Sequence, residues 1–403
     1  MIVSTNPIKN PFKISTITID DFDISDYFLN LTLEEGIFNT FIYGTLVLDR
    51  RNLVPPKTWN NPEFGFINRT FKINWTHNMK DENYEFNKEI ELKIYGIHEN
   101  TMDNIVLLLI QEGAYNFINK QFCDGWKDLN INEIVNDIIF TKTGIKNLSI
   151  TKTSNKFTYV NPIIWSPSQA LKYLLPMMKS ESGDCAYVLF SSTKESGKMY
   201  CLPVNTLFNN KVSEELVLLA KQPEKTTDIE LTLNMILGYN FNSDYSNILE
   251  QMNDDIYGSN IEEYDPKTKV LKPININNII QKNVKMLGSE SSILDNFDTT
   301  ESQYAFYFSG MNGETIEKSE TIYEYLIKNN ILISVYGFST RNVGDIVNLN
   351  LYSGKNMIND PRNEYSGNIM ISNISHMFSI SGYYQKLSCV RSGYNKYENR
   401  DIL

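Results

Sequence analysis

Apolar and polar residues alternate over most of the first 112 residues, which is the pattern of β-strands with one buried face. The alternating segments are short and turn residues separate them, so they predict a small antiparallel barrel or sandwich over residues 14–112. Gly36 and Gly44 lie inside one segment, at positions typical of a bulge or of close backbone approach. The expected strands cover residues 13–19, 28–33, 34–49, 71–77, 88–98 and 104–112.

Helical periodicity replaces this alternation in the middle of the chain. Asn130 or Asn132 can cap a helix that runs to residue 143, and Gly144 fits the C-terminal end of that helix. Ser166 can cap a second helix, with Pro167 at its first position, where a missing N–H costs nothing. Both helices carry an apolar stripe along one face.

A hairpin follows the second helix, with strands at residues 185–191 and 198–204 joined by a Ser196-Gly197 turn. Together these elements predict an α/β unit over residues 113–227. Within this unit, residues 159–207 contain no nucleophile motif, no cluster of metal ligands and no phosphate-binding loop, which favours a docking role.

The alternation returns in residues 228–241 and 331–395, which predict a second β-domain, with a polar insert of unassigned fold at 242–330 between them. Residues 1–13 are expected to form an N-terminal arm and residues 396–403 a C-terminal tail. The predicted fold class is therefore α+β and mainly β, with two antiparallel β-barrel or sandwich domains and with α/β and irregular inserts. The similar order of strands and turns in the two β-domains is compatible with a duplication. The later expected elements are a helix at 314–328 and strands at 331–338, 346–351, 366–375, 376–381 and 383–392.

Composition narrows the classes of function. A formal net charge of -11 and a pI near 5.0 argue against a nucleic-acid-binding face, which needs clustered Lys and Arg. Aromatic residues make up 12% of the chain, which suits β-sheet faces and protein interfaces. No apolar run approaches the ~20 residues of a membrane helix, and the N-terminus has no signal-peptide pattern. We expect a protein that folds in a cytoplasm without membrane insertion.

Candidate reactive residues are scattered. The four cysteines form no CxxC pair, so reduced thiols are expected, although Cys185 and Cys201 could face each other across the hairpin. The three histidines are isolated in the sequence. We therefore predict no catalytic residue, no metal site and no cofactor. The residues concerned are Cys123, Cys185, Cys201, Cys389, His77, His98 and His376.

Three stretches resemble the baseplate hub protein of contractile-tailed bacteriophages, the ring that joins the tail tube to the membrane-piercing spike. Residues 31–49, Leu-Thr-Leu-Glu-Glu-Gly-Ile-Phe-Asn-Thr-Phe-Ile-Tyr-Gly-Thr-Leu-Val-Leu-Asp, are similar to an early hub strand pair that ends in Asp. Residues 159–207 are similar to the short helix of the family and the aromatic-Val-Phe ribbon that follows it. Residues 338–390 are similar to its closing barrel, in which Ile-Ser-Asn-Ile-Ser-His runs into the last antiparallel strand.

The resemblance implies two tube-like β-domains per subunit, in a homotrimer that adapts a threefold spike to a sixfold tail tube. The implied partners are the central spike protein, the tail tube or tube-initiator protein and the baseplate wedge proteins, with DNA only in transit. The implied location is the tail baseplate of a virion that assembles in the host cytoplasm. Among the aromatic residues of these stretches, the candidate protein-interface residues are Phe38, Phe41, Tyr43, Trp165, Tyr187 and Phe190.

Two other classes of function stay open at this point. A tail-associated glycan-cleaving enzyme needs two carboxylates across a cleft, and the chain offers Glu181 and the adjacent pairs Glu34-Glu35 and Glu262-Glu263. Adjacent residues of a strand point to opposite faces, which argues against such a pair. Ser166 and Ser192 lack the G-x-S-x-G context of a hydrolase nucleophile. A host-surface adhesin or tail fibre is expected to show sequence repeats, and none is found.

Overall fold

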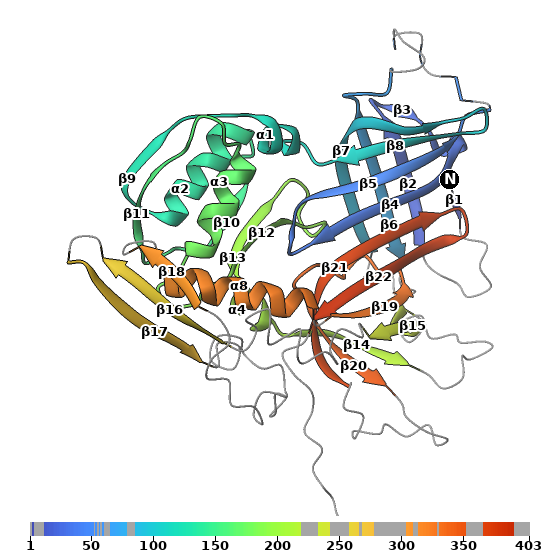
Figure 1. Cartoon of the computed structure of the whole chain (residues 1–403). Coiled ribbons are helices and arrows are strands. Elements are labelled where there is room, and N and C mark those ends of the chain that lie inside the picture. Colours follow the sequence, from blue (N-terminus) through green and yellow to red (C-terminus); the bar gives the residue numbers. More distant parts are fainter. Residues whose placement is uncertain are drawn as a thin grey trace, which may run out of the picture.

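The structure is a computed structural model in which two β-units share one large sheet and an α/β unit lies beside them (Figure 1). The expected C-terminal tail at 396–403 and most of the N-terminal arm lie outside the described residues. The structure describes residues 2–3, 12–51, 53–54, 56, 59, 65–78, 85–218, 233–241, 258–265, 268–277, 304–308, 313–328, 330–351 and 366–390.

The first β-unit is antiparallel throughout, and its strands follow the order β1-β2-β6-β7-β8-β5-β4. Their inward positions carry large apolar side chains such as Ile17, Leu31 and Trp75, which are fully buried. Phe378 and Tyr383 of the second unit complete this core. The elements are β1 (Ile2–Val3), β2 (Phe12–Ile19), β3 (Phe22–Asp23), η1 (Ser25–Tyr27), β4 (Phe28–Gly36), β5 (Asn39–Asp49), β6 (Thr70–Asn78), β7 (Glu85–Asn100) and β8 (Asn104–Ile110).

The second β-unit continues the same sheet, because β21 pairs with β4 of the first unit. Residues 366–381 were expected to form two strands, but β21 is one strand, since the pairing with both neighbours runs through His376. β14 falls in the range expected for the α/β unit, yet it pairs in parallel with β20. The strands are β14 (Val212–Leu218), β15 (Ile236–Phe241), β19 (Asn330–Tyr336), β20 (Ile346–Leu351), β21 (Gly367–Ser379) and β22 (Gly382–Val390).

The α/β unit follows the local signals of its sequence. The side chains of Asn130 and Glu133 form a capping box at the start of α2, and Ser166 with Gln169 forms another at α3. Pro167 takes the first helical position, as predicted. The elements are α1 (Ala114–Asn119), β9 (Gly125–Asn130), α2 (Ile131–Ile138), η2 (Ile139–Thr143), β10 (Leu148–Ile150), β11 (Lys156–Val160), α3 (Pro167–Leu174), η3 (Leu175–Met177), β12 (Tyr187–Ser191), β13 (Met199–Pro203) and α4 (Val204–Phe208).

Within the polar insert, the expected helix is present as α8 (Gly313–Lys328), beside a small sheet of β16 (Gly258–Asp265), β17 (Val270–Asn277) and β18 (Tyr304–Phe308). Ile316 packs into the core of the α/β unit, while Ile322 and Leu326 pack into that of the second β-unit. The hydroxyl of Ser319 accepts a hydrogen bond from the Ala186 N–H, 2.9 Å away. This helix therefore ties the α/β unit to the second β-unit (Figure 1).

Four strands of one β-unit repeat four strands of the other. The order β7-β8-β5-β4 corresponds to β21-β22-β19-β15, and every neighbouring pair in both sets is antiparallel. The β-bulges recur as well. One lies after the first residue of β4 and of β15, and another lies in β7 at Tyr95 and in β21 at Ser372. Matching bulges fix the alignment, because each one shifts the register by one residue.

The turn that leads into the next strand, β6 beside β7 and β20 beside β21, repeats too. The Asn68 N–H donates to the Ile94 carbonyl at 2.7 Å, and the Gly344 N–H donates to the Ile371 carbonyl at 2.8 Å. Asn68 and Gly344 both have positive φ, +66° and +85°. Asn and Gly are the residues that adopt this backbone conformation most readily. These matches are what a duplicated β-unit predicts.

Candidate functional site: the junction of the two β-units

The six aromatic candidates divide between surface and core. Phe38 and Tyr43 are 40% and 43% exposed, and Trp165 is partly exposed. The other three are buried within the chain, where they belong to its hydrophobic cores, so they offer a partner little surface. These core residues are Phe41, Tyr187 and Phe190.

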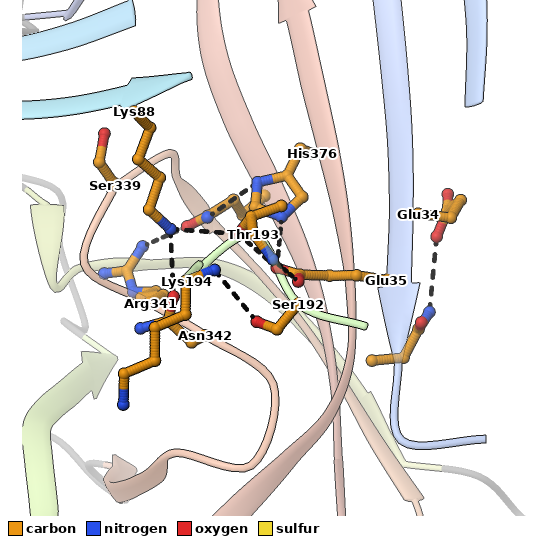
Figure 2. Close-up of polar contacts among 12 residues, drawn as sticks. Glu34, Glu35, Lys88, Ser192, Thr193, Lys194, Ser339, Arg341, Asn342 and His376 are labelled. Carbon is orange, nitrogen blue, oxygen red and sulfur yellow. Dashed lines mark hydrogen bonds and ion pairs between the residues drawn. The ribbon is translucent and has the colours of Figure 1, made fainter. Parts of the chain in front are cut away.

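The polar centre of the molecule is Glu35, which lies in β4 where the two β-units meet. Its carboxylate is fully buried and accepts hydrogen bonds from the Thr193 N–H at 2.6 Å and from His376 Nε2 at 2.9 Å (Figure 2). Burial by itself would raise the pKa of Glu35. The hydrogen bond and charge of His376, the charge of Lys88 and the Thr193 N–H outweigh burial and hold the pKa below its usual value. Glu34 points away and is only partly buried, as expected for adjacent residues of a strand.

A hydrogen-bonded row continues from Glu35 across the second unit. Nδ1 of His376 lies 2.7 Å from the Tyr383 hydroxyl, which accepts from the Gln385 amide at 2.8 Å. The Gln385 carbonyl oxygen then accepts from the guanidinium of Arg341 at 3.0 Å. These four side chains are nearly or fully buried. Because buried polar groups lose water, each of them depends on the next for its hydrogen bonds.

Arg341 binds together segments that are far apart in the sequence. Its Nε donates to Glu214 of β14 at 2.6 Å. Its terminal nitrogens donate to the carbonyls of Tyr336 at 2.6 Å and Leu233 at 2.7 Å. The side chain is only 1% exposed, so these contacts replace the hydration of a full charge.

Two further residues fasten the first unit to this site. Lys88 of β7 donates to Thr193 and Asn342, each at 3.1 Å (Figure 2). His77 of β6 donates from Nε2 to the Gly337 carbonyl at 3.0 Å, so its Nδ1 accepts from the Ser339 hydroxyl. Burial lowers the pKa of His77 to about 3, which keeps the ring neutral in this arrangement. Burial also lowers the pKa of Lys88, against the opposing charges of Glu35 and Asp345.

The chemistry of this site is that of a structural clamp. A carboxylate, an imidazole and a phenol in a row can act as a proton relay, but a relay serves catalysis only if substrate reaches it. Glu35, His376 and Tyr383 are between 0% and 1% exposed, so no substrate can contact them in this conformation. The network instead sets the relative position of β4, β21, the β12–β13 hairpin and the loop after β19.

Other candidate residues stay apart. Cys201 faces Leu189 across the hairpin, so the possible pairing of Cys201 with Cys185 is not found. All four cysteines are free, and burial raises the pKa of Cys185 to about 11. In the described ranges, no three His, Cys, Asp or Glu side chains are grouped so that they could hold a metal ion. No helix in this part of the chain is long and apolar enough to cross a membrane.

Sequence reasoning missed the clamp residues Lys88, Thr193, Arg341 and Gln385. A signal did exist for His376, which takes an inward strand position between the buried residues Ile374 and Phe378. A polar residue at such a position needs a buried partner. The sequence cannot show which residue that is, because Glu35 lies more than 300 positions away.

No protein-family model and no curated protein matches the sequence. Solved structures do match. A tail protein from Neisseria meningitidis MC58 aligns with a TM-score of 0.57 and 9% identity, over 94% of this chain and 96% of that chain. The 43 kDa tail protein of prophage MuSo2 from Shewanella oneidensis aligns with a TM-score of 0.55 and 10% identity, over 94% and 98%. This chain has the fold of phage tail proteins.

A Francisella PdpA-VgrG complex gives a TM-score of 0.51 at 12% identity, over 99% of this chain but 55% of that chain. This chain therefore spans about half the length of that protein. The mainly β fold class is confirmed, and the resemblance stated from sequence is confirmed at the level of the fold.

Proposed function

We propose that the protein is a structural hub of a phage-type tail baseplate, a homotrimeric ring that adapts a central spike to a sixfold tail tube. The observation that carries the proposal is the repeat of four strands within one sheet, in a fold shared over 94% of the chain with phage tail proteins. Three copies of a chain with two like units present six similar units around an axis. A head-to-tail contact closes such a ring after three steps.

The clamp at the junction supports this role physically. A ring with near-sixfold symmetry needs its two units held at one fixed angle, since an error in the angle accumulates around the ring. Buried polar networks whose members hydrogen-bond one another favour one arrangement of the elements they join. Glu35 and Arg341 together reach both β-units, the α/β hairpin and β14.

We assign the tube-like units to residues 14–112 and to residues 228–241 with 331–395, extended by β14. Residues 113–211 and the insert at 242–330 would then face the spike or wedge proteins. The channel would pass DNA without holding it, which the net charge of -11 supports by repulsion. The proposed role is non-enzymatic. The burial of Glu35, His376 and Tyr383 supports this role, because substrate cannot reach them.

The test is the absolute mass by light scattering of the full chain, alone and with a candidate spike protein. We expect three times 46.6 kDa, or a complex of three chains with three spike chains. A monomer that ignores the spike contradicts the proposal. Turnover of peptidoglycan would favour a tail enzyme instead, and binding of host glycans an adhesin.

A further inference from the structure

The strand repeat predicts a second seam that one chain cannot form by itself. Within the chain, β4 of the first unit pairs with β21 of the second. In the repeat, β15 corresponds to β4, and β7 corresponds to β21. The pair equivalent to β4–β21 is therefore β15–β7. These two strands are separated by seven strand spacings, roughly 34 Å along the sheet at ~4.8 Å each, and Figure 1 shows them far apart.

Both strands have an edge available for such a pair. The first half of β7 pairs with β6 up to Lys93, and from Ile94 onward the strand pairs with β8 alone among the described strands. β21 is divided in the same way. It pairs with β20 up to Met370, and after its bulge at Ser372 the same edge pairs with β4. Met235, the residue before β15, makes one parallel bridge to Val217 of β14. Within β15 itself, the residues pair with β19 alone among the described strands.

We propose that the second half of β7 in one copy pairs antiparallel with β15 of the next copy, in the register of the β4–β21 pair. The inference deepens the proposed hub function and rests on it. A strand edge can accept many extended chains, because its N–H and C=O groups carry no sequence information. The favoured occupant here is a second copy, because β15 already reproduces the bulge and register of the strand that fills the equivalent edge.

The register can be stated residue by residue. Asn100 in β7 is equivalent to His376 in β21, because Asn100 pairs with Ile105 as His376 pairs with Gln385. Phe241 in β15 is equivalent to Leu33 in β4, and Leu33 pairs with His376. Asn100 is therefore opposite Phe241 of the neighbouring copy. Thr101 and Asn240 are the equivalents of Met377 and Thr32. Met377 pairs with Thr32, so Thr101 is opposite Asn240 of the neighbouring copy. These equivalences allow for the second bulge of β7, which lies at His98.

A head-to-tail seam of this kind has a definite consequence for assembly. Each copy offers one β7 edge and one β15 edge, so pairing leaves an unused edge at each end until the ring closes. Thr101 and Asn240 are both exposed in the single chain, as the proposed seam requires. Directly opposite residues of antiparallel strands have Cα atoms about 4.5–5.5 Å apart, within reach of a disulfide.

The experiment is a cysteine cross-link in the full chain. The variant carries Thr101→Cys and Asn240→Cys, with Cys123→Ser to remove the exposed native thiol. It is oxidised with copper phenanthroline in the assembled state, alone or with the candidate spike, and separated on a non-reducing gel. We expect a covalent trimer. A mixture of the two single variants is expected to stop at covalent dimers.

A matched control moves one cysteine along the same exposed edge. His98→Cys with Asn240→Cys places the two thiols about three residues, roughly 10 Å, out of register, beyond the ~7 Å limit for a disulfide. We expect little or no covalent trimer from it. Equal cross-linking of the two variants contradicts the proposed seam. So does the absence of cross-linking from the predicted pair when light scattering shows a trimer. Either result leaves the proposed trimeric ring in place. A monomer under all conditions overturns the ring and the seam together.

Discussion

Replacing Arg341 with alanine tests whether the clamp holds the molecule together. The guanidinium is 1% exposed and joins Glu214 at 2.6 Å, the Leu233 carbonyl at 2.7 Å and the Tyr336 carbonyl at 2.6 Å. Arg341→Ala removes the positive charge and leaves a largely buried carboxylate without its partner. The change also leaves two carbonyl groups without this donor.

The expected loss follows from these contacts. Removing one partner of a buried ion pair costs about 3–5 kcal/mol, because the other charge stays buried. An unsatisfied buried acceptor costs about 1–3 kcal/mol, but these terms overlap and partial hydration relieves them. We therefore expect Arg341→Ala to lower the free energy of unfolding by about 4 kcal/mol. Arg341→Met combined with Glu214→Leu is expected to recover at least half of that loss, since neither charge of the pair is then left buried without its partner.

Urea unfolding followed by tryptophan fluorescence measures this difference. Trp75 is a suitable reporter, because its indole donates to Ser339 of the junction at 3.0 Å. The control is Arg51→Ala, which removes an ion pair with Asp49 from a residue that is 65% exposed, and we expect no resolvable change. A loss below about 1 kcal/mol for Arg341→Ala, the range of exposed ion pairs, would refute the clamp.

Two further predictions concern the same junction. Gly337→Ala places a Cβ 2.2 Å from the ring of Tyr383 and should cost about 1–3 kcal/mol of unfolding free energy by overpacking, whereas Gly125→Ala meets only ordinary contacts. Equal urea midpoints for the two variants would contradict this packing. His77 stays neutral when folded because burial lowers its pKa to about 3, so the unfolded chain binds the extra proton between about pH 6.5 and 3. Unfolding free energy should fall as pH falls through this window, and His77→Gln should flatten the slope between pH 7 and 5, when calorimetric or urea data are compared. An unchanged slope would show that His77 is hydrated.

Local signals in the sequence predicted local structure well. The caps at Asn130 and Ser166 and the proline at position 167 act within a few residues, so the sequence around them was enough. The expected division into two strands at His376 was wrong because it too was drawn from local sequence alone. A histidine among apolar residues interrupts the pattern, but pairing with strands on both sides carries β21 through it.

Long-range placement could not be predicted in the same way. Phe38 and Phe41 lie in one aromatic-rich segment, yet Phe38 is exposed and Phe41 is packed against Phe117 of the α/β unit. Which of them is covered depends on where the α/β unit docks. The clamp also depends on long-range placement, because Glu35 and His376 meet only after β4 and β21 have paired.

The two seams of the proposed ring share a backbone register but differ in their side chains. At the seam within the chain, His376 is buried against Glu35 and receives the support of Thr193 and Lys88 through that carboxylate. At the proposed seam between copies, the residue equivalent to His376 is Asn100, which is exposed. A buried polar network requires its partners to be present as the chain folds, since unpaired groups are costly. An exposed polar edge stays hydrated until the next copy arrives. The difference thus fits one seam that forms with the fold and one that forms on assembly.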